Sequence, residues 1–385
     1  MDEIKQKDRQ YILGTYGRFD LHIVRGKGAV CEDEQGKKYI DLGSGIGVNS
    51  LGYCDDGWVK AVEEQLETLQ HTSNLYYTSP GALLAEALCS RTGYSKVFFC
   101  NSGAEANEAA IKTARKYSFN KYGQGRNKII TLNKSFHGRT MATLTATAQE
   151  AMHNFFYPFN EGFEYCEKDI EDIKSRQGVC AVMLEFIQGE GGVIPLDKHF
   201  VEQVYDYCKS NDILFIADEV QTGVGRTGRF LCSEHYGVKP DVTTLAKGLG
   251  GGLPIGAMLA GEKCEGVMGA GTHGSTFGGN PVVCAGGRYV LSRLTDEFLG
   301  EVREKGELVK ELLIGAKGAK SVSGLGLMLG IELEEKKASD VVKECINRGV
   351  IPLTAKEKVR LLPPLIITKE ELKKAVGILK EVIGE

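Results

Sequence analysis

Several features that would place a chain outside the ordinary globular proteins are missing from this sequence. Neither sign of charge is in large excess, because 47 basic and 51 acidic residues leave a net charge of -4. Such a balance gives no global attraction to nucleic acid or to anionic membranes. No apolar run approaches the roughly 18 residues of a membrane span, and residues 1–10 are polar, without the apolar core of a signal peptide. We therefore expect no nucleic-acid partner, no membrane partner and a cytoplasmic location.

The sequence also lacks the spacing of a crosslinked or metal-binding protein. Its eleven cysteines are odd in number, and no two lie within three residues of each other, which excludes a disulfide framework and a zinc ribbon. None of the seven histidines falls in an H-E-x-x-H frame. We expect reduced thiols and no metal site.

Two glycine-rich segments lack the residues that nucleotide sites require. In residues 43–47 a dinucleotide fingerprint would need a third glycine where Val48 stands, and residues 223–228 are followed by Arg229 instead of the lysine of a phosphate-binding loop. Proline is scarce, with nine residues, whereas the 49 glycines exceed the usual share of roughly 7%. They cluster between apolar segments, which predicts turns or close backbone approach to a ligand.

Length and periodicity predict an α/β protein of two or more domains. A chain of 385 residues corresponds to two or three domains at roughly 100 to 200 residues each. Short runs rich in β-branched and aromatic residues alternate with helical patterns, which indicates buried parallel strands in a large doubly wound domain. We expect these strands at 96–100, 128–132, 180–184, 213–217, 242–246 and 255–260.

The two ends of the chain follow different patterns from the middle. The first fifty residues predict a hairpin around Gly36. The last hundred mix helices with strand-like runs, which indicates a smaller α+β domain. The predicted division is 1–55 for an N-terminal segment of the small domain, 56–280 for the large domain and 281–385 for the C-terminal small domain.

Three of the expected strands lead into residues whose side chains or backbone could bind a ligand or take part in catalysis. One ends at Asp218, one delivers Lys247 into a run of glycines, and one leads into residues 101–107 and an alanine-rich helix. Ligands of open α/β sheets bind beyond the carboxyl ends of the strands. Taken singly, such a lysine is explained as a surface residue beside a turn. Likewise, Ser-Gly before a helix is explained as a helix cap.

Taken together, the three segments predict a site for pyridoxal phosphate. A lysine amine can form a Schiff base, an aspartate can keep a pyridine nitrogen protonated, and a helix N-terminus can hold a phosphate. These are the three groups by which a protein holds this cofactor.

Eight sequence blocks, in order, resemble the class III (ornithine-type) aminotransferases of fold type I. The blocks are 73–77, 101–107, 136–140, 188–192, 218–221, 246–256, 274–281 and 360–364. The resemblance covers essentially the whole chain and implies the fold type I transferase architecture, with the large domain binding pyridoxal 5'-phosphate. The chain departs from the family pattern at Phe186, where proline is usual, and at residues 52–56, where Gly-His-x-His-Pro is usual.

The resemblance implies roles for individual residues. For the cofactor it implies a Schiff base from Lys247, pairing of Asp218 with the ring nitrogen, contact of Gln221 with the phenolic oxygen, Phe136 and Val220 on the two ring faces, and phosphate binding by Ser102, Gly103 and Ala104 with Thr276 from the other subunit of a dimer. For the substrate it implies carboxylate binding by Arg139 and Arg360, Glu190 beside Arg360, and Ser275.

The resemblance further implies an activity. Within the family the chain is most similar to members that transfer the δ-amino group of N-acetylornithine to 2-oxoglutarate, giving N-acetylglutamate 5-semialdehyde and glutamate in arginine biosynthesis. Transferases of ornithine, succinylornithine or other ω-amines remain alternatives, as do a glutamate-1-semialdehyde aminomutase and an inactive binding protein. Gly45, where the ornithine enzymes place a tyrosine, favours the acetylated substrate.

Overall fold

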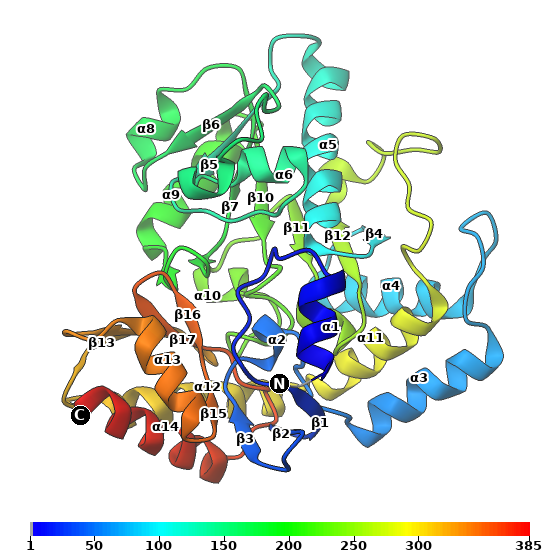
Figure 1. Ribbon diagram of the computed structural model, residues 1–385. Coiled ribbons are helices and arrows are strands. Elements are labelled where there is room, and N and C mark those ends of the chain that lie inside the picture. Colours follow the sequence, from blue (N-terminus) through cyan, green and yellow to red (C-terminus); the bar gives the residue numbers. More distant parts are fainter. Residues whose placement is uncertain (1–2) are drawn as a thin grey trace.

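A seven-stranded sheet occupies the upper part of the computed structural model, which describes residues 3–385 (Figure 1). Its strands lie in the order β4-β12-β11-β10-β7-β5-β6. They are β4 (Lys96–Cys100), β5 (Lys128–Leu132), β6 (Phe163–Cys166), β7 (Val179–Leu184), β10 (Leu214–Asp218), β11 (Val242–Leu245) and β12 (Gly256–Ala260). The six strands expected from the sequence are present, each within one or two residues of its predicted ends.

One of the expected strands runs in the opposite direction. β12 pairs antiparallel with both β11 and β4, whereas the pairs from β11 to β6 are parallel. The prediction of a parallel strand at 255–260 was therefore wrong. Only residues 246–255 connect β11 to β12, and a parallel crossover needs a dozen or more residues. Since β4 is antiparallel to β12 in turn, β4 points the same way as β10 and β11.

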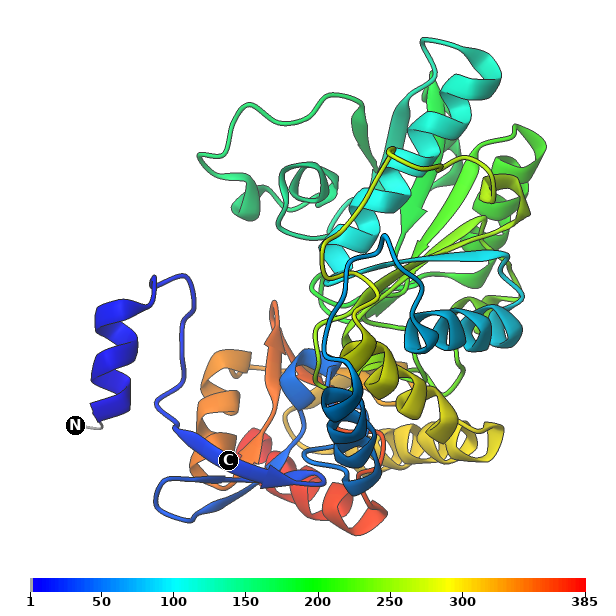
Figure 2. The same cartoon turned by 90° about the vertical axis from the view of Figure 1, so that its right-hand side faces the viewer.

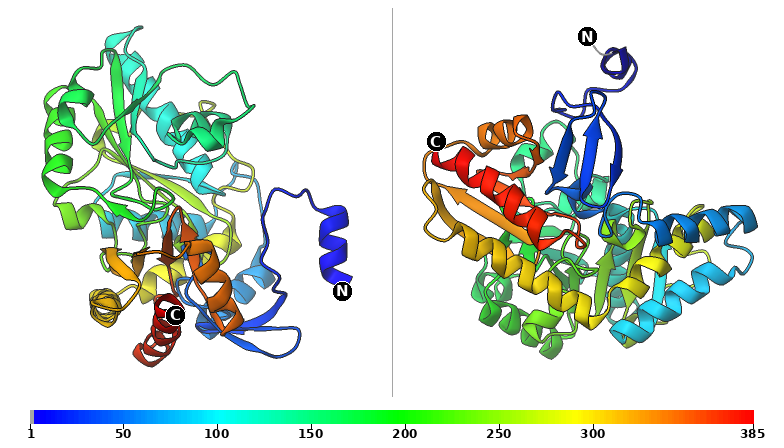
Figure 3. Two further views of the ribbon diagram at one scale, coloured as in Figure 1. Left: turned by 60° about the vertical axis from the view of Figure 1, so that its left-hand side comes forward. Right: turned by 90° about the horizontal axis from the view of Figure 1, so that it is seen from below.

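Helices cover both faces of this sheet, as a doubly wound domain requires (Figure 3). α5 (Gly103–Tyr122) packs on β4, β11 and β12, while α9 (Lys198–Ser210) packs on β10 from the other side. Four of the eight residues that α5 buries are alanines, and these small side chains let the helix approach the sheet closely. The remaining elements around the sheet are α6 (Met141–Ala146), α7 (Glu150–His153), α8 (Ile170–Lys174), α10 (Ser233–Tyr236), η1 (Lys247–Gly250), η2 (Glu262–Cys264) and the short pair β8 (Ile187–Gln188) and β9 (Ile194–Pro195).

Two smaller sheets lie beside the carboxyl-terminal helices (Figure 1). One contains β1 (Ile23–Lys27), β2 (Val30–Asp33), β3 (Lys38–Asp41) and β15 (Val350–Ile351), and the other contains β13 (Ala319–Leu325), β14 (Met328–Leu333), β17 (Lys358–Leu361) and β16 (Leu353–Ala355). β2 and β3 form the expected hairpin, in which Gly36 has a φ of +82°. β15 pairs in parallel with β3, so the two ends of the chain share a sheet. The residue limits of the domains stay a prediction.

The remaining helices connect the sheets or cover the smaller ones. They are α2 (Ser44–Gly47), α3 (Asp56–Thr68), α4 (Ser79–Thr92), α11 (Pro281–Arg293), α12 (Asp296–Leu313), α13 (Ala338–Asn347) and α14 (Lys369–Gly384). At the segment that departs from the family pattern, the Asp55 side chain caps α3 by accepting a hydrogen bond of 3.0 Å from the Trp58 amide. Asp55 thus performs the capping that this helix start requires.

The N-terminal arm, residues 3–22, stands away from the rest of the molecule (Figure 2). None of the residues of its helix, α1 (Glu3–Tyr11), is buried. Leu13 is 83% exposed and Tyr11 is 75% exposed, an unusual position for apolar side chains. Within residues 3–385, no helix combines the length and the apolar composition that crossing a membrane requires.

Candidate active site

The carboxyl ends of three strands meet at a cavity of about 430 Å³. β10 ends at Asp218, β11 ends two residues before Lys247, and β4 is followed by Ser102, which caps α5. These ends meet because β4, β10 and β11 point the same way. The predicted site residues that line the cavity are Ser102, Gly103, Ala104, Phe136, Arg139, Asp218, Val220, Gln221 and Lys247.

Lys247 enters the cavity from a strained backbone. Its φ is +46°, a left-handed conformation that costs a residue with a side chain roughly 1–2 kcal/mol. Burial lowers the pKa of its ammonium, a shift that Glu190 opposes and the nearby Arg360 charge reinforces. A lowered pKa increases the fraction of neutral amine, the form that can accept a proton or attack a carbonyl.

Asp218 is held by three hydrogen-bond donors. Its Oδ2 accepts from Asn107 Nδ2 at 2.8 Å and lies 2.8 Å from His137 Nδ1, while its Oδ1 accepts from the Val220 amide at 3.0 Å. The residue is only 4% exposed. The carboxylate is therefore fixed in orientation at the cavity wall.

Two of these neighbours and one further acid were missed by sequence reasoning. His137 and Glu185 line the same cavity as Asn107. Glu185 accepts hydrogen bonds from the amides of Phe136 and Gly189, at 2.9 and 3.4 Å, and burial raises the pKa of its carboxyl. The sequence did hold a signal, because Asn107 is a polar, weak helix former within an alanine-rich helix.

The start of α5 is shaped for an anion. Ser102 accepts a hydrogen bond from the Glu105 amide at 3.2 Å, and the first amides of a helix carry partial positive charge. A Cβ added at Gly103 would lie 2.6 Å from Val220 Cγ1, so only glycine allows this close approach. The amides of the helix end, the Lys247 amine and the Asp218 carboxylate are the groups that a phosphorylated pyridine aldehyde requires, so the residues present fit it.

Arg360, Glu190 and Gln221 form a second group next to the cavity. Arg360 comes from β17 and Glu190 from the turn between β8 and β9. The Arg360 guanidinium forms an ion pair with Glu190 and donates to Gln221 Oε1 at 3.3 Å. Burial acts to raise the pKa of Glu190, but the Arg360 charge and hydrogen bonds outweigh it and the pKa is lowered. The expected neighbourhood of Glu190 and Arg360 is present in the structure.

Arg139 is the other arginine, and it lies over the Phe136 ring, with 5.5 Å from its guanidinium carbon to the ring centroid. It precedes α6 in a loop that also contributes His137 to the cavity. Arg139 is exposed, whereas Arg360 is 3% exposed. The two cationic groups thus differ in access to solvent.

The structure does not bring Ser275 and Thr276 to the cavity wall of their own chain. Ser275 Oγ accepts from Asn101 Nδ2 at 3.1 Å and from the Gly278 amide at 2.9 Å. Thr276 is exposed on the loop between β12 and α11, next to Phe277, which is 59% exposed.

Comparison with known proteins identifies the family. The model of the aminotransferase class-III family matches residues 14–383, and the chain belongs to this family, whose cofactor is pyridoxal 5'-phosphate. It is 51% identical to the acetylornithine aminotransferase of Haemophilus ducreyi over 389 aligned positions, covering 100% of this chain and 99% of that protein.

Solved structures agree with this assignment. The ornithine aminotransferase of Toxoplasma gondii superposes with a TM-score of 0.95 at 31% identity, covering 99% of this chain and 94% of that one. The N-acetylornithine aminotransferase of Stenotrophomonas maltophilia superposes with a TM-score of 0.85 at 35% identity, covering 98% of both chains. The expected fold type I architecture and the expected enzyme class are confirmed.

Proposed function

We propose that the protein transfers the δ-amino group of N-acetylornithine to 2-oxoglutarate, giving N-acetylglutamate 5-semialdehyde and glutamate, a step of arginine biosynthesis. The observation that carries the proposal is the convergence of Lys247, Asp218 and the start of α5 on one cavity that Arg139 also lines. The names and full-length identities of the relatives support the substrate.

In this proposal each residue of the site has a distinct role. Bound pyridoxal phosphate supplies an electron-withdrawing ring that stabilises the charge left when a substrate carbon loses its proton. The Lys247 amine carries that proton, and Asp218 pairs with the ring nitrogen. Ser102, Gly103 and Ala104 hold the phosphate, Phe136 and Val220 enclose the ring, and Gln221 contacts its phenolic oxygen. Ser275, bonded to Asn101 at the edge of the site, assists substrate binding.

Measuring the two half-reactions separately tests the proposed function. Candidate amines are added singly to the purified holoenzyme, and the cofactor absorbance is followed; 2-oxoglutarate is then added to restore it. N-acetylornithine should react fastest. Reaction only with free ornithine would reject the substrate, and amine isomerisation without 2-oxoglutarate would indicate an aminomutase.

The ion pair between Glu190 and Arg360 explains how one site accepts two kinds of substrate. Planar arginine side chains suit bidentate binding of carboxylates. We propose that Glu190 neutralises Arg360 while the acetylornithine carboxylate lies on Arg139, and that it moves away when the α-carboxylate of 2-oxoglutarate needs Arg360. The lowered pKa keeps Glu190 ionised in the pair.

Glu190→Ala should impair the half-reaction with acetylornithine more than the half-reaction with 2-oxoglutarate. Without Glu190, Arg360 is a permanent receptor for α-carboxylates, so the variant should also gain activity toward α-amino acids. Single-turnover rates of each half-reaction measure this difference. Equal losses in both halves would reject the switch, and Glu334→Ala, at an acid in the small domain outside the site, serves as the control.

Gly45 is proposed to determine preference for the acetylated amine. It lies in a left-handed turn with a φ of +64°, and a Cβ there would meet Val48 at 3.8 Å. Val48 in turn lines the cavity. A tyrosine would add a hydroxyl partner for a free α-amino group and bulk against an acyl group, at a backbone cost of roughly 1–2 kcal/mol.

The wild-type enzyme should prefer N-acetylornithine over ornithine in kcat/KM by at least about tenfold, and Gly45→Tyr should narrow or reverse this ratio. Steady-state kinetics with both amines provide the measurement, and Gly45→Ala controls for backbone strain. An unchanged ratio in a folded Gly45→Tyr enzyme would mean that Gly45 serves only the turn.

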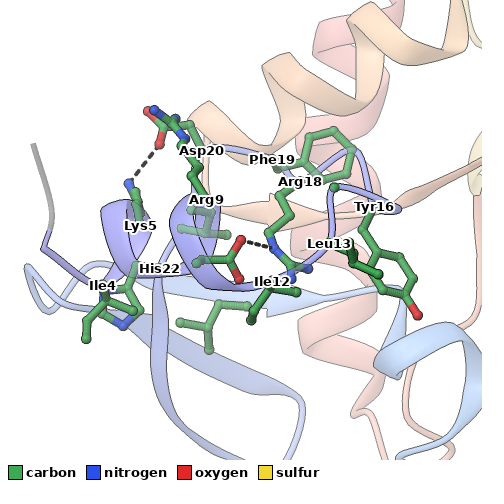
Figure 4. Close-up of a pocket in the computed structure, with 14 residues that line it drawn as sticks. Ile4, Lys5, Arg9, Ile12, Leu13, Tyr16, Arg18, Phe19, Asp20 and His22 are labelled. Carbon is green, nitrogen blue, oxygen red and sulfur yellow. Dashed lines mark hydrogen bonds and ion pairs between the residues drawn. The ribbon is translucent and has the colours of Figure 1, made fainter.

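We also propose that the enzyme is a homodimer in which Thr276 reaches the phosphate site of the partner. Support comes from the exposed Thr276 loop and from the N-terminal arm, in which Tyr11, Leu13 and Tyr16 are largely exposed. The arm encloses a cavity of about 440 Å³, across which Lys5 pairs with Asp20 and Arg18 with Asp8 (Figure 4). Sedimentation at several concentrations tests the dimer.

The proposed location is the cytoplasm. All eleven cysteines are free, and nine of them are buried, which suits a reducing compartment. Fractionation of cells that produce the protein tests this location.

A further inference from the structure

Asn107 is a buried polar residue at the point where the three parts of the cofactor site meet. It is 1% exposed and lies in the second turn of α5, the helix whose start is assigned to the phosphate. Asparagine is a poor helix former, and a buried amide is costly unless its hydrogen bonds are satisfied.

The hydrogen bonds of Asn107 are made to both neighbouring strands. Its Nδ2 donates to Asp218 Oδ2 of β10 at 2.8 Å and to the His137 carbonyl at 2.7 Å. Its Oδ1 accepts from Thr244 Oγ1 of β11 at 2.7 Å. Thr244 lies three residues before Lys247, so this one amide connects the helix, the carboxylate strand and the lysine strand.

The contacts also determine which way the amide points. The His137 carbonyl can only accept, so the Nδ2 group must face it and Asp218, while the Thr244 hydroxyl donates to Oδ1. If that hydroxyl were absent, the buried Oδ1 would lose the donor it has in the structure, and the amide would lose one of the three hydrogen bonds that hold it in place. Thr244 therefore helps to hold Asn107 at the position from which it donates to Asp218.

We propose that Asn107, oriented by Thr244, is a positioning residue that fixes the Asp218 carboxylate for the ring nitrogen of the cofactor. The proposal rests on the role assigned to Asp218 and does not depend on which amine is the substrate. Asn107 and Asp218 line the cavity together, and the three donors to Asp218 leave its carboxylate no freedom to rotate.

The test compares two neighbouring threonines with different partners. Thr243 and Thr244 are both fully buried on β11, but the Thr243 hydroxyl lies 2.6 Å from the Tyr94 hydroxyl, away from the site. Thr244→Val and Thr243→Val each remove one buried hydroxyl with little change of volume. Thr244→Ser keeps the hydroxyl, and Asn107→Leu removes the amide altogether.

For each variant the cofactor dissociation constant, kcat, KM and the urea midpoint of the apoprotein are measured. Asn107→Leu removes a hydrogen bond to a charged carboxylate, and Thr244→Val removes a hydrogen bond that holds its donor. Both variants should therefore lower kcat and weaken cofactor binding by at least about tenfold. KM for 2-oxoglutarate should change less than about twofold, because no substrate group is lost. Thr244→Ser should keep kcat close to that of the wild type, because it keeps the hydroxyl. Thr243→Val should lower only the urea midpoint.

Two results would overturn the proposal. One is a Thr244→Val protein with unchanged cofactor affinity and kcat. In that case the hydrogen bond between Thr244 and Asn107 would have only a structural role. The other is an equal loss of cofactor affinity in Thr243→Val and Thr244→Val, which would mean that any buried hydroxyl of β11 matters alike. Because cofactor affinity is measured without an amine, an error in the proposed substrate would not alter either reading.

Discussion

Lys247→Ala should abolish covalent attachment of the cofactor and reduce turnover by at least about a thousandfold, since both a nucleophile and a proton carrier are lost. Lys247 follows a buried strand, lines the cavity and has a lowered amine pKa. Treatment of the holoenzyme with borohydride, followed by peptide mapping, should locate the reduced adduct at Lys247 in the wild type and nowhere in the variant.

A suitable control is Lys263→Ala. Lys263 lies 3.2 Å from Asp241, outside the cavity, and its loss should leave attachment and turnover intact. Recovery of the reduced adduct on Lys263 or Lys128 of the wild-type chain would contradict the assignment.

Asp218→Asn should keep the fold but lower kcat by about 10²–10³-fold, comparable to the loss of one preorganised electrostatic partner in other enzymes. A neutral amide cannot form an ion pair with a protonated ring nitrogen. It would also place an NH₂ group or a carbonyl among donors that now meet a carboxylate. Stopped-flow measurement of either half-reaction should show the loss in the chemical step.

Asp33→Asn provides the comparison, because Asp33 is a buried acid that accepts from Tyr39 at 2.8 Å, away from the cavity. Near-normal half-reaction rates in Asp218→Asn would mean that another acid, such as Glu185, serves the ring nitrogen.

The parts of the site that follow strand ends could be predicted from the sequence. Lys247 and Asp218 stand directly after apolar runs, and parallel strands bring their carboxyl ends to one edge of a sheet whatever the order of the strands. The direction of β12 could not be derived from apolar periodicity, because a buried strand has the same composition in either direction. The short connection between β11 and β12, residues 246–255, did indicate an antiparallel direction, because it is too short for a parallel crossover.

Residues that act through another side chain escaped prediction. Asn107 is separated in sequence by 111 residues from Asp218 and by 137 residues from Thr244. No local sequence pattern predicts contacts at such separations. Glu185 directly follows β7 and Asp218 ends β10, but these two acids at neighbouring strand ends could not be ranked without their hydrogen bonds. The proposed contact of Thr276 with a second chain rests on the family resemblance, because the periodicity of one chain carries no information about a partner.

The pairing of β3 with β15 has a consequence for synthesis of the chain. The strands of the seven-stranded sheet are complete once residue 260 has left the ribosome, whereas the sheet begun by residues 23–41 waits for residues 350–351. Contacts so distant in sequence form late, because closing a long loop costs entropy before any pairing compensates for it. On a growing chain the edge of β3 therefore stays open for some 300 residues, and Lys247 and Asp218 can assemble before Arg360 has been translated. The end of the site proposed to hold the cofactor is built first, and the proposed receptor for the second carboxylate is added last.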